Sequence, residues 1–134
     1  MIIFLVGIII FGAAVLMLIG RFGRKIPRRL NQQYYQNKWL ELLARVKTSD
    51  GMVLAIIDAD KLLDEALRKR GFKGKTMGER LVAAQRSLTD NDGVWYAHKL
   101  RNRLVHEPSV NLKKREAQTA LGGFRRGLKD LGAL

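Results

Sequence analysis

The sequence contains no cysteine, no glycine-rich phosphate loop, no His-Glu-x-x-His motif and no serine set between glycines. These absences exclude the common signatures of nucleotide-binding proteins, zinc proteases and serine hydrolases. The lack of cysteine also excludes disulfides and fits a reducing compartment. His98 and His106 lie eight residues apart, two turns along a helix, so they cannot share a metal as an i, i+4 pair does. We therefore expect neither a metal nor a cofactor.

Charge is absent from the first twenty residues, whose only non-apolar residue type is glycine. At about 1.5 Å per residue, a helix from Ile2 to Ile19 spans roughly 27 Å, close to the ~30 Å hydrocarbon thickness of a membrane. A cleavable signal peptide would need a basic segment before the apolar run and a small-x-small cleavage site after it. The run instead follows Met1 directly and ends at Gly20-Arg21. Residues 1–20 are therefore predicted to be an uncleaved transmembrane helix.

Acidic residues are also absent from the segment that follows, because the first one is Glu41. Residues 21–30 form a polybasic juxtamembrane linker whose cations are Arg21, Arg24, Lys25, Arg28 and Arg29. Basic flanks stay in the cytosol, so we expect a single-pass protein of the plasma (inner) membrane, with its N-terminus outside. The same five residues are predicted to contact anionic lipid headgroups, each contributing roughly 1 kcal/mol.

The remaining residues, 31–134, suffice for one small hydrophobic core. Apolar residues recur there at three- and four-residue steps, and no strand pattern competes, so the fold class is all-α. Four to five helices are expected. The first covers 31–46, the second begins at 48–51 and ends at 70, and the third begins at 76. The fourth runs from about Val94 to His106, and the last covers 112–131. Gly122-Gly123 predicts a bend or a close approach to another helix in the last of these. A formal net charge of +13 favours anionic lipid, nucleic acid or both as partners.

The helix that ends near His106 carries the residues best suited to chemistry. Pro108 disfavours the helical conformation at the residue before it, so His106 lies in the final turn. Asn102 and His106, four residues apart, share one face, and Arg101 lies about 140° from His106 around the helix. A histidine there can exchange a proton near neutral pH. The alternative is a histidine that caps the helix, with the arginines facing solvent.

The segment Arg101-Asn102-Arg103-Leu104-Val105-His106 resembles the Arg-Asn-x-x-x-His signature of the HEPN superfamily of helical domains, as found in bacterial members. The resemblance covers the chain from about Asn31. It implies a helical bundle that dimerises through the motif helix. Many members are metal-independent endoribonucleases, and many others are non-catalytic partners or RNA-binding modules.

The resemblance also implies a role for each motif residue, if the domain is catalytic. His106 would act as general base or acid on the RNA 2′-hydroxyl and the leaving oxygen. Arg101 would neutralise the charge of the phosphorane, and Asn102 would position the phosphate or orient His106. The products would be a 2′,3′-cyclic phosphate and a 5′-hydroxyl.

Asp60 is expected on the apolar stripe of the second predicted helix of the domain. An ionised carboxylate at such a position needs a partner. The motif helix offers His98, Arg101 and Arg103, so we predict that Asp60 pairs with that helix and orients Arg101. The alternative is an aspartate at the edge of the core that pairs with a surface lysine.

Three functions fit these features. The first is a membrane-anchored interaction or RNA-binding module, which tethering to a membrane favours over a freely diffusing enzyme. The second is a metal-independent endoribonuclease that uses Arg101 and His106. The third is a scaffold that binds anionic lipid. Trp95 and Tyr96 bear on the choice, because RNA-binding proteins often expose aromatic side chains for stacking, whereas both residues would suit the core equally well.

Overall fold

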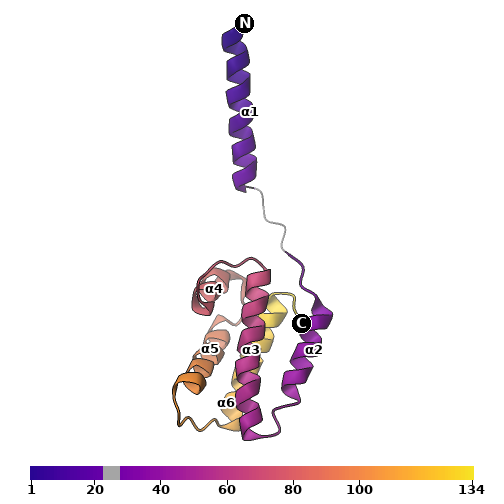
Figure 1. The fold of residues 1–134 in the computed structure, drawn as a ribbon, viewed down its shortest axis with the longest axis vertical. Helices are drawn as coiled ribbons and strands as arrows, with labels where there is room; N and C mark the ends of the chain where they lie inside the picture. The colour runs from indigo at the N-terminus through magenta and orange to yellow at the C-terminus, as the bar shows by residue number, and fades with distance from the viewer. Residues whose placement is uncertain (23–27) are drawn as a thin grey trace.

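The computed structural model describes residues 1–22 and 28–134, and over these residues it is all-helical (Figure 1). An apolar helix, α1 (Ile2–Phe22), precedes a bundle of five α-helices. These are α2 (Gln32–Leu43), α3 (Ser49–Lys69), α4 (Met77–Ala84), α5 (Asn91–His106) and α6 (Lys114–Asp130), and a short 3-10 helix, η1 (Gln85–Ser87), follows α4. The predicted class, an N-terminal apolar helix followed by four to five bundle helices, is confirmed.

Helix α1 is separate from the core of the bundle. Its segment Ile2–Gly20 is long and apolar enough to cross a membrane, and none of that segment is buried. Every buried core residue lies at Tyr35 or beyond. A fragment of residues 28–134 therefore contains the complete core described here.

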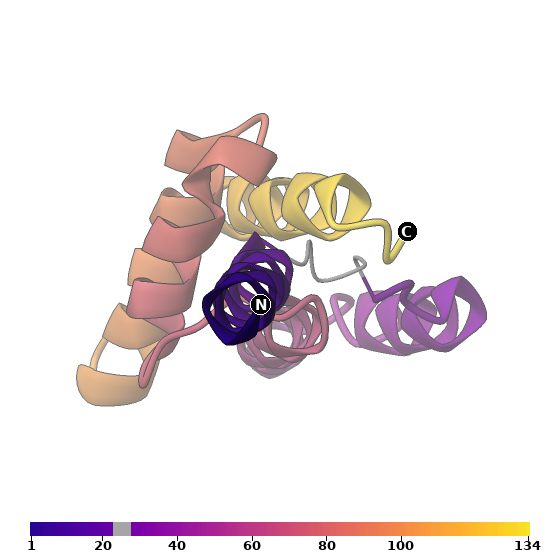
Figure 2. The ribbon, with the colours of Figure 1, turned by 90° about the horizontal axis from the view of Figure 1, so that it is seen from above.

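Helix α3 is the centre of the bundle. It packs against α2, α4, α5 and α6, and the view from above shows α2, α6 and α5 arranged around it (Figure 2). Its core-facing residues repeat at three- and four-residue steps and are all fully buried: Ala55, Ile56, Ala59, Leu63, Ala66 and Leu67. This pattern of small and large apolar residues lets α3 contact neighbours on several sides.

Short polar side chains determine where most of the helices begin. Thr48, Thr76 and Asp90 each accept a hydrogen bond from the backbone N–H three residues later, at 3.0, 3.2 and 3.0 Å. Such bonds satisfy donors that the first helical turn leaves unpaired. The cap at Asp90 starts α5 at Asn91, three residues before the predicted start at Val94.

Both ends of α2 also differ from the predicted ones. The first predicted bundle helix was placed over 31–46, but α2 ends at Leu43 because the chain turns over the next residues. Asn31 caps α2 and is not part of it. At the end of α3, Gly71 adopts a φ of +89°, a left-handed conformation that glycine tolerates, and it ends the helix next to the predicted boundary at residue 70.

Helix α6 approaches α5 and α3 closely through glycines. A Cβ at Gly123 would lie 2.4 Å from the Gly93 carbonyl oxygen, and one at Gly127 would lie 3.2 Å from Val94 Cγ2. Of the two predicted alternatives for Gly122-Gly123, the close approach is confirmed, whereas α6 runs as one continuous helix. Contact between the backbones of Gly123 and Gly93 therefore brings α6 and α5 close together.

Alanine substitutions at these adjacent glycines should have opposite effects. Gly123→Ala forces a methyl group into the Gly93 backbone and should lower the free energy of unfolding by about 1 to 3 kcal/mol. Gly122→Ala meets only the flexible end of Arg126 and should raise it by up to about 1 kcal/mol, through helix propensity. Urea denaturation of the 28–134 fragment measures both. Equal effects of the two substitutions would contradict the close approach.

Candidate functional site

Four polar side chains from α3 and α5 form a closed ring in the bundle. Asp60 Oδ1 lies 2.8 Å from His98 Nδ1, and Asp60 Oδ2 lies 3.3 Å from Arg101 Nε. Asn102 Nδ2 lies 3.4 Å from His98 Nε2, and Arg101 Nη1 donates to Asn102 Oδ1 at 3.0 Å. Asp60 is thus joined to His98 and to Arg101, and Asn102 joins these two to each other. We call this set the Asp60 ring.

The hydrogen-bond partners of His98 determine which of its two ring nitrogens carries the proton. The carboxylate of Asp60 can only accept, so His98 Nδ1 carries a proton. In the neutral tautomer, His98 Nε2 then accepts from the Asn102 amide, whose oxygen accepts from Arg101. Each of the three hydrogen bonds in the Asp60 ring therefore has a donor and an acceptor, and the charges of Asp60 and Arg101 balance.

Burial makes the Asp60 ring energetically important. Asp60 is 3 % exposed and His98 is 8 % exposed. A carboxylate at such depth is stabilised only when it is paired and hydrogen-bonded. Arg101 supplies the opposite charge, although its Nε is not aligned for a hydrogen bond, so the Arg101 contact is an ion pair and the His98 contact is the hydrogen bond. The predicted pairing of Asp60 with the motif helix is confirmed.

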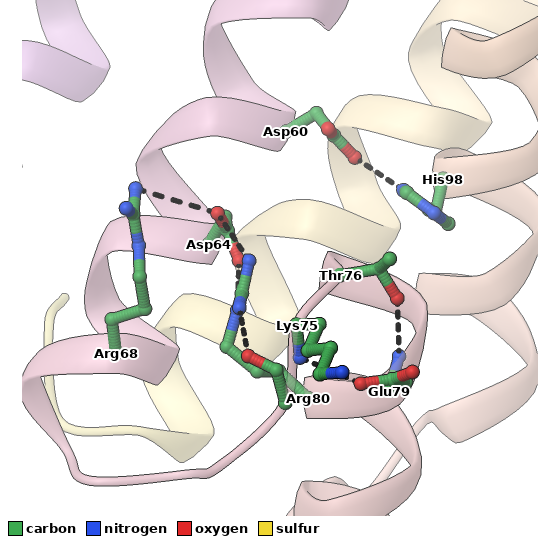
Figure 3. A network of polar contacts seen from close by, with 9 residues as sticks. Asp60, Asp64, Arg68, Lys75, Thr76, Glu79, Arg80 and His98 are labelled. Atoms are coloured by element: carbon green, nitrogen blue, oxygen red, sulfur yellow. Dashed lines mark hydrogen bonds and ion pairs between the residues drawn. The ribbon is translucent and has the colours of Figure 1, made fainter.

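A second ion pair, which is partly buried, lies one helical turn further along α3 (Figure 3). Asp64 accepts two hydrogen bonds from Arg80, from Nε at 2.6 Å and from Nη2 at 3.0 Å. Arg80 also donates to the Gly74 carbonyl at 2.6 Å, and Arg68 lies 3.4 Å from the same carboxylate. This bidentate pair joins α4 to α3. The sequence did not reveal it, because nothing in the spacing of Asp64 and Arg80 indicates contact.

A cleft of about 480 Å³ is lined by both the Asp60 ring and the Asp64–Arg80 pair. Its polar lining comes from α3, α4 and α5 and includes Asp60, Asp64, Arg80, His98, Arg101 and Asn102. The arginine charges in this cleft are largely neutralised by the aspartates they contact. Arg101 keeps about a quarter of its side chain exposed there.

His106 lies apart from this cleft. It is exposed, in the last turn of α5, and it is not among the residues that line the cleft. Arg103 also faces outward and lies 3.9 Å from Glu107. Among the described residues, three of the predicted site residues therefore lie together: Asp60, Arg101 and Asn102. The fourth, His106, lies apart from them. His98, which the sequence suggested only as one of three partners for Asp60, is the histidine in the cluster.

The outer face of α5 carries a different set of side chains. Tyr96 is 40 % exposed, and Lys99 and Arg103 are exposed. Their spacing of three and seven residues places all three on one side of the helix. Trp95 is half-buried and makes an edge-to-face contact with His98, at 6.0 Å between ring centres. We call Tyr96, Lys99 and Arg103 the outer stripe of α5.

Only some of the predicted lipid-contacting residues lie within the part of the chain that the structure describes. Arg24 and Lys25 lie outside the described residues, and the side chain of Arg21 is likewise outside them. Arg28 and Arg29 are exposed and lie a few residues before the start of α2 at Gln32. These two are therefore accessible to a headgroup.

Loss of the Asp60 carboxylate should destabilise the bundle far more than loss of an exposed carboxylate on the same helix. Asp60→Ala leaves the Arg101 charge and the His98 donor without their buried partner and should lower the free energy of unfolding by about 3 kcal/mol or more. Asp58→Ala removes an exposed ion pair with Arg45 and should cost less than about 1 kcal/mol. Urea denaturation of the 28–134 fragment compares them. Similar costs would show that the Asp60 ring does not stabilise the bundle.

Comparison of the chain with protein-family models, with curated proteins and with solved structures gives no match. The interpretation of the site therefore depends on its own residues and geometry.

Proposed function

We propose that the chain is a membrane-anchored, HEPN-like helical module that binds RNA without cleaving it. The observation that carries the proposal is the outer stripe of α5, where an exposed aromatic ring is followed by two exposed cations on one helix face. Single-stranded RNA is bound by base stacking on aromatic rings together with phosphate contacts to lysine and arginine. The net charge of +13 supports a polyanionic partner.

The Asp60 ring favours binding over catalysis. An arginine that stabilises a phosphorane must direct its guanidinium at the phosphate. Arg101 instead contacts Asp60 and Asn102, and His106 lies outside the cleft that Arg101 lines. The Arg101-Asn102 half of the motif thus supports the position of α5, and the exposed residues of the same helix remain accessible to RNA.

Location in the cytosol is part of the proposal. Arg28 and Arg29 follow α1 without any acidic residue between them and the apolar segment, and such basic flanks are retained in the cytosol. The N-terminus would then lie outside the plasma (inner) membrane and the bundle inside, where RNA is present.

Dimerisation through α5 is also part of the proposal. Val82 of α4 and Val105 of α5 are 55 % and 47 % exposed, so both helices leave apolar surface for contact with a second copy. Two copies related by a two-fold axis would double the number of aromatic and basic groups along the bound RNA. Sedimentation velocity of the 28–134 fragment over a range of concentrations tests this. A monomer at every concentration would remove the dimer from the proposal.

A second function, metal-independent RNA cleavage by Arg101 and His106, is favoured by one observation. Arg101 lines a cleft large enough for a nucleotide and retains exposed surface there. Cleavage would need His106 to reach the same phosphate from the last turn of α5.

Substitutions in the outer stripe should weaken RNA binding selectively. Tyr96→Ala removes a stacking platform that typically contributes about 1 to 3 kcal/mol per base, so the dissociation constant for single-stranded RNA should rise roughly tenfold. Arg103→Ala should reduce the salt dependence of binding by about one phosphate contact. Arg115→Ala removes an equally exposed cation from α6 and serves as the control. Fluorescence anisotropy with the 28–134 fragment measures all three.

The outcome of the same titration separates the two functions. Equal binding by Tyr96→Ala, Arg103→Ala and Arg115→Ala would contradict the outer stripe as the RNA site. Incubation of RNA with the fragment in EDTA tests cleavage. We expect intact RNA, whereas cleavage that is lost in both Arg101→Ala and His106→Ala would support the nuclease instead.

The proposed orientation predicts that a cysteine placed in the bundle is inaccessible from outside the cell. The chain has no cysteine of its own, so Ser109→Cys provides one exposed thiol between α5 and α6. In intact cells that express the full chain, a membrane-impermeant maleimide should leave it unlabelled, and cell lysis should restore labelling. Labelling of intact cells would place the bundle outside.

A further inference from the structure

The start of α2, the end of α3 and the end of α6 meet at one end of the bundle (Figure 1). A pocket of about 390 Å³ lies between them, lined by Arg29, Leu30, Gln32, Arg70, Leu131 and Gly132. Two of these six residues are arginines and none is acidic. The pocket therefore has the charge of an anion-binding site.

Arg70 lacks an acceptor at one of its buried donors. It is the C-terminal cap of α3, where the chain turns into the loop that precedes α4. Its Nε is inaccessible to solvent and has no hydrogen-bond partner among the described residues. A buried guanidinium donor of this kind calls for an acceptor oxygen, and arginine matches the geometry of a phosphate.

Neighbouring carboxylates are already paired with other cations. Glu65 pairs with Lys69 at 2.8 Å, and Asp64 pairs with Arg80 and Arg68. Among residues 28–134, no carboxylate forms an ion pair with Arg29 or Arg70. The two pocket arginines thus retain their positive charge for an external anion.

The covalent chain holds this end of the bundle near the membrane. Five residues, 23–27, lie between Phe22, the last residue of α1, and Arg28. The six Cα–Cα steps from Phe22 to Arg28 span at most about 22 Å even when fully extended. The pocket arginine Arg29 follows directly, so an α1 that crosses a membrane keeps the pocket within reach of the headgroups at its C-terminal end.

From these observations we infer that the pocket between Arg29 and Arg70 binds the phosphate of an anionic phospholipid headgroup in the same membrane that holds α1. Binding docks the bundle on the membrane by the end that contains the start of α2 and the end of α3. Helix α5 lies along the side of the bundle (Figure 1), so its outer stripe stays accessible when this end is docked. The inference does not depend on RNA binding.

Energy transfer from the bundle to the lipid surface tests the docking. The full chain, reconstituted in nanodiscs, carries one fluorophore at Gln33→Cys, in the first turn of α2, or at Ser109→Cys, at the opposite end of the bundle. Lipids whose headgroups carry the acceptor fluorophore report how close each labelled position lies to the membrane surface. Addition of phosphatidylglycerol to phosphatidylcholine nanodiscs should increase transfer from position 33 and leave transfer from position 109 low.

Charge substitutions distinguish the pocket from general attraction of a basic protein. Arg29→Gln and Arg70→Gln should each reduce the ratio of docked to undocked bundle about fivefold, the effect of one basic residue at an anionic surface. Arg115→Gln, at the far end of α6, removes the same charge and should leave the ratio unchanged. Should Arg70→Gln unfold, Arg29→Gln decides, because Arg29 is exposed and precedes α2.

Two outcomes would overturn the inference. Transfer from position 33 that is the same with and without phosphatidylglycerol would show that anionic headgroups do not dock the bundle. Equal effects of Arg29→Gln and Arg115→Gln would show that net charge, and not the pocket, causes docking.

Discussion

The buried carboxylate of Asp60 is the constraint on which the arrangement of α5 depends. An aspartate on the core stripe of α3 destabilises the bundle unless a neighbouring helix supplies both a donor and a positive charge. Helix α5 supplies them from residues three apart, His98 and Arg101. Satisfying Asp60 therefore fixes the rotation of α5 about its own axis, and this rotation directs Tyr96, Lys99 and Arg103 outward.

Glycine contacts constrain α5 from the other side. The Gly123 and Gly93 backbones are too close for any side chain to fit between them, so α6 determines the distance to α5, while Asp60 determines its orientation. The partly buried Arg80–Asp64 pair joins α4 to α3 beside the cleft that Arg101 lines. Two electrostatic contacts and one steric contact thus join four helices, α3, α4, α5 and α6, and the exposed stripe lies on the outer side of α5.

Much of this architecture is predictable from the sequence, and the unpredictable parts have a common cause. The apolar spacing of α3, its start next to Thr48, its end next to Arg70 and the start of α4 next to Thr76 depend on local signals, and each is found where it was expected. Asp60 was also identifiable as needing a partner. The sequence offered three polar residues on α5 as that partner, and the choice among them depends on the rotation of α5 relative to α3. The Arg80–Asp64 pair likewise depends on the path of a loop, which no local spacing encodes.

The carboxylate that positions α5 also opposes the binding of an anion at Arg101. A phosphate that approached the guanidinium would lie near Asp60 as well, because Asp60 Oδ2 is only 3.3 Å from Arg101 Nε. Two negative charges this close to each other repel, and the repulsion is weakly screened at Asp60 because that carboxylate is buried. Withdrawal of Arg101 toward the phosphate would leave Asp60 without its ion-pair partner, at a cost of about 3 to 5 kcal/mol. Lys99 and Arg103 carry no such cost, since both are exposed, and the outer face of α5 is therefore the more favourable place for a phosphate.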